Sequence, residues 1–219
     1  MDFSRTIVLD LKRYGEYNSS VKERMMIMKD IPKASFVCTG ENALELSGSI
    51  CCAGKLIKIL RHSGYMTGGC YSCISPKSCV DSLRERIRDM TKCCDLVVTI
   101  GSEGFKNSDV LPEITQSLSD RQAPFFAYWL SAGDTNDKGA GKTSNLVDED
   151  FVFPSRATAA FCNNALIINM PSDPAVARKR ICALLPSISY ALGTKVGTDE
   201  NGLFNAEKIV SDYLRNKSL

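Results

Sequence analysis

The sequence predicts an α/β protein whose sheet is mostly parallel. From residue 35 onward, segments typical of strands alternate with segments of helical spacing, which is the pattern of βαβ units. Asp95–Ile100 (DLVVTI) is apolar without alternation, as expected for a strand covered on both faces. Val80–Thr91 carries its apolar residues on one helical stripe, so this helix can cover one face of such a sheet.

Strand signals recur along the chain. Ser35–Thr39 (SFVCT) is a short β-prone run, and Cys70–Ile74 is a weaker one. Ala165–Met170 (ALIINM) is a second run without alternation, which again indicates a buried strand.

Helical segments separate these strands. In Gly48–Gly64 the apolar residues recur at helical spacing, and the final glycine is placed to end the helix. Pro112 opens a short helix and Pro174 opens a long one, since proline suits the first helical turn. Phe125–Leu130 (FFAYWL) fits either a strand or a buried helical segment, and a last helix is expected at 205–215.

Two segments fall outside the alternation. Residues 1–34 are rich in charge and contain a methionine run without a clear period, and we interpret them as an N-terminal extension of a domain that spans 35–219. Residues 131–150 are polar and rich in Gly and Asp, which indicates an irregular loop.

Composition excludes several classes of protein. The 219 residues carry a net charge of +2, which favours neither a nucleic-acid partner nor a membrane surface. No apolar run approaches the roughly 18 residues that span a bilayer. The N-terminus lacks the apolar core of a signal peptide, so we expect a cytoplasmic protein whose ten cysteines are reduced.

The segment that follows Asp95–Ile100 is the first candidate for a binding site. It leaves the strand through Gly101 and Gly104, and glycines let backbone amides approach a phosphate closely. Asp109 and Glu113 supply carboxylates of the kind that hold Mg²⁺. The same spacing also fits an ordinary glycine turn before a capped helix.

A second candidate follows Ala165–Met170. The bend Pro171-Ser172-Asp173 leads into the N-terminus of a helix, and such an end attracts anions. Ligands of open parallel sheets lie beyond the carboxyl ends of the strands, so this bend could form the opposite wall of the same site. Asp173 acting only as the helix N-cap explains the sequence equally well.

Three other patterns are weaker. Gly139–Thr143 (GAGKT) imitates a P-loop, but the pattern's first glycine is Asn136 and no amphipathic helix follows. Cys70, Cys73, Cys79 and His62 could be drawn as a metal site, although no second cysteine pair has the required spacing. Arg156 follows a β-prone stretch at 151–153 and could clamp either an anion or a surface carboxylate.

The ordered set of motifs resembles the MoaB/MogA family. Residues 95–115 (DLVVTIGSEGFKNSDVLPEIT) are similar to its D-L-hydrophobic-T-G-G-T-G-x-x-x-R-D-x-T-P-E signature. Residues 154–160 (PSRATAA) resemble S-R-x-x-A-G, and 165–174 (ALIINMPSDP) resemble L-I-I-N-h-P-G-x-P. Ser47-Gly48 falls where the family has R-S-G-P. The likeness runs from about 35 to 195 in the family's order.

That resemblance implies a three-layer α/β/α sandwich, usually assembled as a homotrimer. It also implies molybdopterin as ligand. Active members use ATP and Mg²⁺ to adenylate the terminal phosphate of the pterin, before metal insertion. Members such as the G domain of gephyrin show that the fold also serves as an anchor.

The roles that the resemblance implies fall on both candidate segments. Asp109 and Ser155 would be the catalytic residues, and Asp109 with Glu41 would hold the metal. The residues expected to bind cofactor and nucleotide are Ser47, Gly48, Gly101, Ser102, Gly104, Glu113, Arg156, Pro171 and Ser172.

Departures from the family pattern affect the chemical residues. Ser102, Glu103 and Ser108 replace a glycine, a threonine and an arginine, and Lys77 stands where relatives have an aspartate. Glu103 adds negative charge where phosphates are expected, and at about 4 Å such repulsion is on the order of 4 kcal/mol. Two hypotheses therefore stand: an Mg-ATP-dependent molybdopterin adenylyltransferase, or a catalytically degenerate trimer that binds or scaffolds.

Overall fold

Six strands form one mixed sheet in the order β2-β1-β3-β6-β5-β4. The computed structural model describes residues 31–131 and 155–193. The four strands on one side of the sheet pair in parallel: β2 (Met66–Ile74), β1 (Lys33–Gly40), β3 (Leu96–Ile100) and β6 (Ala165–Met170). The two strands that complete it pair antiparallel: β5 (Ala159–Cys162) and β4 (Arg121–Gln122). The expected mostly parallel sheet is confirmed.

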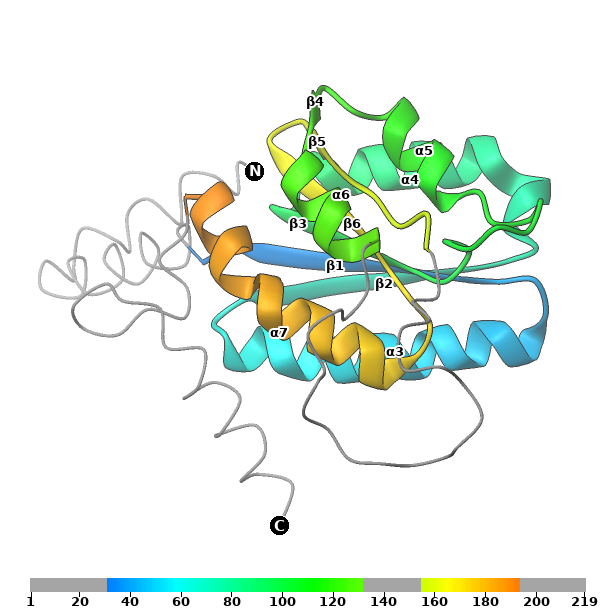
Figure 1. Ribbon diagram of the computed structural model, residues 1–219, viewed down its shortest axis with the longest axis horizontal. Coiled ribbons are helices and arrows are strands. Elements are labelled where there is room, and N and C mark those ends of the chain that lie inside the picture. The colour runs from blue at the N-terminus through cyan, green and yellow to red at the C-terminus, as the bar shows by residue number, and fades with distance from the viewer. Residues whose placement is uncertain (1–30, 132–154, 194–219) are drawn as a thin grey trace, which may run out of the picture. The chain divides into compact units, whose positions relative to one another are not determined.

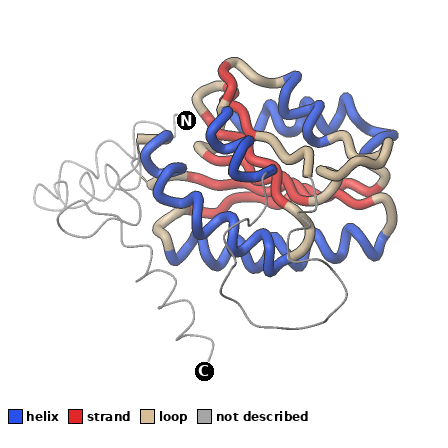
Figure 2. Tube along the Cα trace, in the orientation of Figure 1, coloured by secondary structure: helices blue, strands red, loops and turns tan. Residues whose placement is uncertain are grey.

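Helices cover both faces of this sheet (Figure 1). One apolar cluster joins the sheet to α3 (Ala43–His62), α6 (Pro124–Ser131) and α7 (Pro174–Ala191). The opposite cluster joins it to α4 (Val80–Thr91) and α5 (Leu111–Ser117). Figure 2 shows the strands between these two helical layers. The architecture is therefore the three-layer α/β/α sandwich that the resemblance implied.

The central strands explain why their sequences lack alternation. Every residue of β3 and of β6 is buried, because helices pack on both faces of the sheet. Val98 and Ile168 face the layer of α3 and α7, whereas Val97 and Ile167 face the layer of α4 and α5.

Several elements differ from the expected bounds. Strand β1 begins at Lys33, within the segment interpreted as an extension. Helix α3 begins at Ala43 instead of residue 48, because the Asn42 side chain accepts hydrogen bonds from two amides of the first turn. Phe125–Leu130 lies in helix α6, where Phe126 is buried and Tyr128 is 70% exposed. The helix therefore has one buried and one exposed face, instead of being buried all round.

Strands β4 and β5 were not expected. β4 has two residues and β5 has four, which is too short for a recognisable alternation. The predictions for residues 1–30, the GAGKT segment, the stretch 151–153 and the helix at 205–215 lie outside the described residues. Within 31–131 and 155–193, no helix is both long and apolar enough to cross a membrane.

A buried amide joins the last parallel strand to three neighbouring elements. Asn169 in β6 is 0% exposed. Its side-chain Nδ2 donates to the hydroxyls of Thr99 in β3 (2.7 Å) and Thr115 in α5 (2.9 Å). Its Oδ1 accepts from the amide of Thr158 at 3.1 Å, and its own amide donates to the Thr158 carbonyl. Because buried polar groups are costly when unpaired, this network fixes the segment before β5 against the sheet.

Replacing this amide tests the network. In Asn169→Ala two hydroxyls and one backbone amide lose buried partners, so we expect the free energy of unfolding to fall by about 3 kcal/mol. Urea unfolding measures this change, with Gln116→Ala on the exposed side of α5 as the control, expected within about 0.5 kcal/mol of wild type. A loss below about 1 kcal/mol for Asn169→Ala contradicts the structural role given to this amide.

Candidate functional site

The two candidate bends lie side by side at the carboxyl edge of the parallel strands. Ile100 and Met170 are partners in the β3–β6 ladder. One residue further along, the amide of Gly101 donates to the carbonyl of Met170 at 3.1 Å. The loop after β3 and the bend after β6 therefore start from one point of the sheet, as a shared binding site requires.

Gly101 is the position where the chain is most constrained. Its φ of +88° belongs to the left-handed region, which favours glycine. A Cβ atom here would lie 2.5 Å from the Thr39 carbonyl oxygen and 2.8 Å from the Ser49 hydroxyl. The backbone of the loop can thus pass between the end of β1 and the start of α3 only because this residue has no side chain.

Ser102 continues this tight turn. It also has a positive φ, +46°, which is uncommon for a residue with a Cβ atom. The Thr39 hydroxyl donates to the Ser102 hydroxyl at 3.0 Å, and the Ser102 carbonyl accepts from the amide of Leu111 at the start of α5. These contacts hold the residue in its strained conformation.

Arg156 binds the loop after β3 from the other side. Its Nε donates to the Gly104 carbonyl and its Nη2 to the Asp109 carbonyl, both at 2.6 Å. Its Nη1 forms an ion pair with the Glu113 carboxylate, and its guanidinium carbon lies 5.8 Å from the Phe105 ring centroid. Of the two alternatives for Arg156, the structure shows the carboxylate partner, together with loop carbonyls.

Ser155 and Glu103 contact each other directly. The Ser155 hydroxyl donates to the Glu103 carboxylate and accepts from the amide of Ala157. The Arg156 amide also donates to the Glu103 carbonyl at 3.1 Å. In this conformation the Ser155 hydroxyl, which was expected to contact the pterin, is therefore hydrogen-bonded to the Glu103 carboxylate.

Asp109 closes the same loop. Its Oδ2 accepts from the amide of Lys106 at 2.8 Å. A Cβ atom at Gly104 would lie 2.8 Å from that oxygen, so the glycine makes room for the carboxylate. No partner of Oδ1 is found among the described residues. In residues 31–131 and 155–193, no group of three or more His, Cys, Asp or Glu side chains is placed to hold a metal ion.

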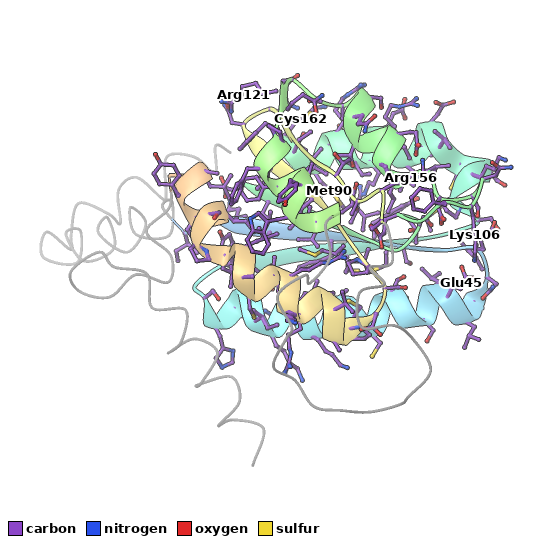
Figure 3. All side chains as sticks on the ribbon, viewed as in Figure 1. Glu45, Met90, Lys106, Arg121, Arg156 and Cys162 are labelled. Atoms are coloured by element: carbon purple, nitrogen blue, oxygen red, sulfur yellow. The ribbon has the colours of Figure 1, made fainter. Side chains whose placement is uncertain are left out.

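The first turn of α3 faces the loop. The Lys106 ammonium lies 3.4 Å from the Glu45 carboxylate, and Figure 3 shows these two side chains near each other at this edge. The Glu45 carboxylate also accepts from the amide of Glu41. That amide and the nearby ammonium lower the pKa of Glu45 below its ordinary value.

The remaining predicted residues lie on α3 and on the bend after β6. Ser47 is exposed in α3, and next to it Gly48 leaves open space where a Cβ would lie. Pro171 is half-buried and Ser172 is exposed. Asp173 accepts from the amides of Ala175 and Val176 at 2.8 and 2.9 Å. The N-cap interpretation of Asp173 is therefore confirmed, and these two amides are already occupied.

The cysteine motif does not form one centre. Cys70 and Cys73 are three residues apart in strand β2, and residues at that spacing point to opposite faces of a sheet. Cys73 packs in the α4–α5 layer, whereas Cys70 lies against Cys38 of the α3–α7 layer. The thiols therefore cannot converge on one ion.

Known proteins resemble this chain in sequence and in fold. No family model matches the sequence. The sequence is 30% identical over 104 residues to a protein of Helicobacter pylori (strain ATCC 700392 / 26695) named molybdopterin adenylyltransferase, covering 48% of this chain and 53% of that one. The chain thus spans about half the length of the curated relatives it matches.

Solved structures show the same fold. A molybdopterin biosynthesis protein from Mycobacterium abscessus superposes with a TM-score of 0.58 and 22% identity, over 74% of this chain and 94% of that chain. The MoaB enzyme of Thermus thermophilus gives a TM-score of 0.57 and 20% identity, over 75% and 98% of the two chains.

In fold, the chain is similar to the solved MoaB and MogA proteins.

The departures from the MoaB/MogA pattern now have positions in space. Glu103 points its carboxylate at Ser155, within the loop that resembles the family signature. Ser108, which replaces the family's arginine, is 6% exposed. The guanidinium of Arg156, from the segment before β5, contacts this loop.

Sequence reasoning missed the residues that position the loop after β3. Asn169 and Thr158 fix the segment that carries Arg156. Thr39 contacts Ser102 from the end of β1. An amide side chain inside an otherwise apolar strand was the available signal for Asn169, because a buried polar residue requires partners.

A pair of glycine substitutions tests the constraint at the loop. Gly101→Ala places a methyl group against backbone and forces a positive φ, so we expect a loss of about 2 kcal/mol or more in the free energy of unfolding. Gly54→Ala, in α3 with open space around it, should gain about 0.5–1 kcal/mol. Urea unfolding compares them, and equal stabilities would contradict the close approach at Gly101.

The Glu45 contacts predict a pH dependence. The pKa of Glu45 is lower in the folded protein than in the unfolded chain. The ionised carboxylate therefore stabilises the fold fully above the unfolded-state pKa of about 4.3, and this stabilisation is lost as the pH falls through the folded-state pKa. Glu45→Gln should therefore be less stable than wild type at pH 7, with a difference that shrinks below pH of about 5. Urea unfolding across this range, with Glu85→Gln as an exposed control, measures it. A difference that grows on acidification would contradict the assignment.

Proposed function

We propose that this chain binds molybdopterin and Mg-ATP at the carboxyl edge of its parallel strands and transfers an adenylyl group to the pterin's terminal phosphate. The main support is the contact between the Gly101 amide and the Met170 carbonyl. It brings together the two bends that the family motifs occupy. The likeness to curated molybdopterin adenylyltransferases supports the same class of activity, in the biosynthesis of the molybdenum cofactor.

The residues at this edge have separate roles in the proposal. Gly101 and Gly104 keep the loop backbone close to the sheet, so that phosphate oxygens can approach amides. Ser47 and Gly48 on α3, with Pro171 and Ser172 on the bend after β6, would line the adjoining walls of the site. Ser155 contacts the phosphate of the pterin once its hydroxyl turns away from Glu103.

The reaction is an adenylyl transfer. An oxygen of the pterin's terminal phosphate attacks the α-phosphorus of ATP, the bond to the β-phosphate oxygen breaks, and pyrophosphate leaves. The protein's contribution is to align the two phosphates and to offset their charge. Lys106, which lies within the loop and pairs with Glu45 of α3, would supply positive charge for this.

Mg²⁺ would be held by carboxylates of this edge. The ion usually takes one or two protein carboxylates and completes its shell with phosphate oxygens and water, so a cluster of three side chains is not required. Asp109 would hold it through Oδ1, with Glu41 as the second carboxylate. When bound, Mg²⁺ neutralises charge on the phosphates.

A second candidate is a protein that keeps the fold but not turnover. The Ser155 hydroxyl is hydrogen-bonded to the Glu103 carboxylate. The guanidinium of Arg156 is bound by the carbonyls of Gly104 and Asp109 and by the Glu113 carboxylate. A loop whose polar groups bind each other has fewer free groups for a ligand. This arrangement suits a binding or scaffolding role, for which the homotrimer implied by the family remains a prediction.

Adenylyl transfer separates the two candidates. Purified full-length chain, incubated with molybdopterin and Mg-ATP, should release pyrophosphate and form adenylated pterin. Asp109→Asn should reduce the rate by about 100-fold or more, whereas Asp89→Asn on the exposed side of α4 should leave it unchanged. Absence of product from a folded wild-type chain would refute the transferase and favour the scaffold.

The charge of Glu103 gives an independent test of nucleotide binding. Glu103→Gln keeps the size of the side chain and removes one negative charge from the loop. If phosphates bind here, calorimetric titration with Mg-ATP should show about tenfold tighter binding or more. Glu85→Gln, an exposed position of α4, controls for net charge. Equal affinities for Glu103→Gln and wild type would place the nucleotide elsewhere.

A further inference from the structure

Strand β2 directs its two cysteines into two separate thiol pairs. On one face, Cys70 has its sulfur 3.5 Å from that of Cys38 in β1. On the other face, the Cys73 sulfur lies 2.6 Å from that of Cys79, at the end of the short 3₁₀ helix η1 (Pro76–Cys79). The same strand thus presents thiols to neighbours in both layers.

The two pairs differ in how easily they could bond. In the β1–β2 ladder the partner of Cys38 is Ser72 and not Cys70. A disulfide between Cys38 and Cys70 would therefore require the two strands to slide along each other. Cys73 and Cys79 are six residues apart and are joined by a turn, which includes Ser75 in the left-handed region. A small side-chain rotation there would bring the sulfurs to the bonding distance of about 2.05 Å.

We propose that Cys73 and Cys79 form a reversible disulfide by exchange with a low-molecular-weight disulfide, and that this bond fixes the turn 74–79 at the carboxyl edge of the sheet.

The exchange proceeds in two steps. The Cys79 thiolate attacks one sulfur of the small disulfide and releases one small thiol, which leaves a mixed disulfide on the protein. The Cys73 thiolate then attacks the Cys79 sulfur and releases the second small thiol. The protein loses two electrons and two protons, and the small disulfide gains both.

Exposure decides the order of the two steps. Cys79 is partly exposed, whereas Cys73 is buried, 7% exposed. Burial, together with the neighbouring Cys79, raises the pKa of Cys73 to about 12. Once Cys79 is in a mixed disulfide it no longer carries a thiolate, so the part of the pKa increase of Cys73 that Cys79 causes disappears.

The bond would act on the backbone next to the candidate site. Ser75 donates its amide to the Gly40 carbonyl at 2.9 Å and its hydroxyl to the Glu41 carbonyl at 3.2 Å. The turn also carries Lys77, which is exposed. Oxidation would restrict the turn that carries Ser75 and Lys77, next to the end of β1, whatever ligand the edge binds.

Peptide mapping of the full-length chain tests the disulfide. After incubation with oxidised glutathione, alkylation and trypsin digestion without reductant, Cys73 lies on residues 62–77 and Cys79 on 78–84, because trypsin cleaves after Lys77. Mass spectrometry should detect the two peptides linked, and dithiothreitol should separate them. Cys70→Ser, which removes the other cysteine of 62–77, should leave the link intact.

Three outcomes would overturn the proposal. One is Cys79 recovered as alkylated or stably glutathionylated peptide. Another is a link from 62–77 to residues 34–55, which carry Cys38, Cys51 and Cys52, in place of the link to 78–84. The third is loss of the 62–77 to 78–84 link in Cys70→Ser. Cys79→Ser, at the less buried position, removes the only cysteine of 78–84, so the linked mass should be absent while circular dichroism stays native. The test therefore does not depend on a variant of the buried Cys73.

Discussion

The buried amide of Asn169 determines how this sheet edge is built. It lies fully buried near the carboxyl end of β6 and hydrogen-bonds β3, α5 and the segment before β5 at once. That segment carries Ser155 and Arg156, which reach the loop after β3. Because an unpaired amide in this position would be costly, the segment has one favourable placement, and the contacts of the loop follow from it.

The loop itself is held by two opposite constraints. Gly101 lets its backbone enter the narrow space beside Thr39 and Ser49, and Arg156 binds its carbonyls from the far side. A loop held by such contacts favours binding, because little ordering is left to be done when a ligand arrives. The cost is that Arg156 is engaged and that Glu103 contributes negative charge. The fixed shape of the loop therefore favours binding of an anion, whereas the charge of Glu103 and the engagement of Arg156 oppose it.

The sequence was sufficient for the layers and for the adjacency of the two bends. Unbroken apolar runs such as Leu96–Ile100 identify buried strands. The loops that follow parallel strands lie at one edge of the sheet, and those after β3 and β6 are neighbours because these two strands pair directly. The short antiparallel strands were not predictable, because two or four residues carry no period. Helix α3 started early since Asn42, and not an apolar repeat, sets its first turn.

The sequence predicted where the site residues lie, but not which groups they hydrogen-bond or pair with. The motif placed Ser155, Arg156 and Asp109 near one another, yet their bonds depend on which groups compete for them. Glu103 takes the Ser155 hydroxyl, and Glu113 takes part of the Arg156 guanidinium. Pairings between residues about fifty positions apart follow from three-dimensional packing, which residue spacing alone does not specify.

Amide chemical shifts offer the most direct measurement of whether the two bends act as one anion site. In a titration of the ¹⁵N-labelled chain with Mg-ATP, the amides of Gly101, Ser102 and Gly104 should shift together with that of Ser172, with one common dissociation constant. Shifts confined to one bend, or centred on another part of the chain while both bends stay unchanged, would contradict a shared site at the carboxyl edge of the sheet.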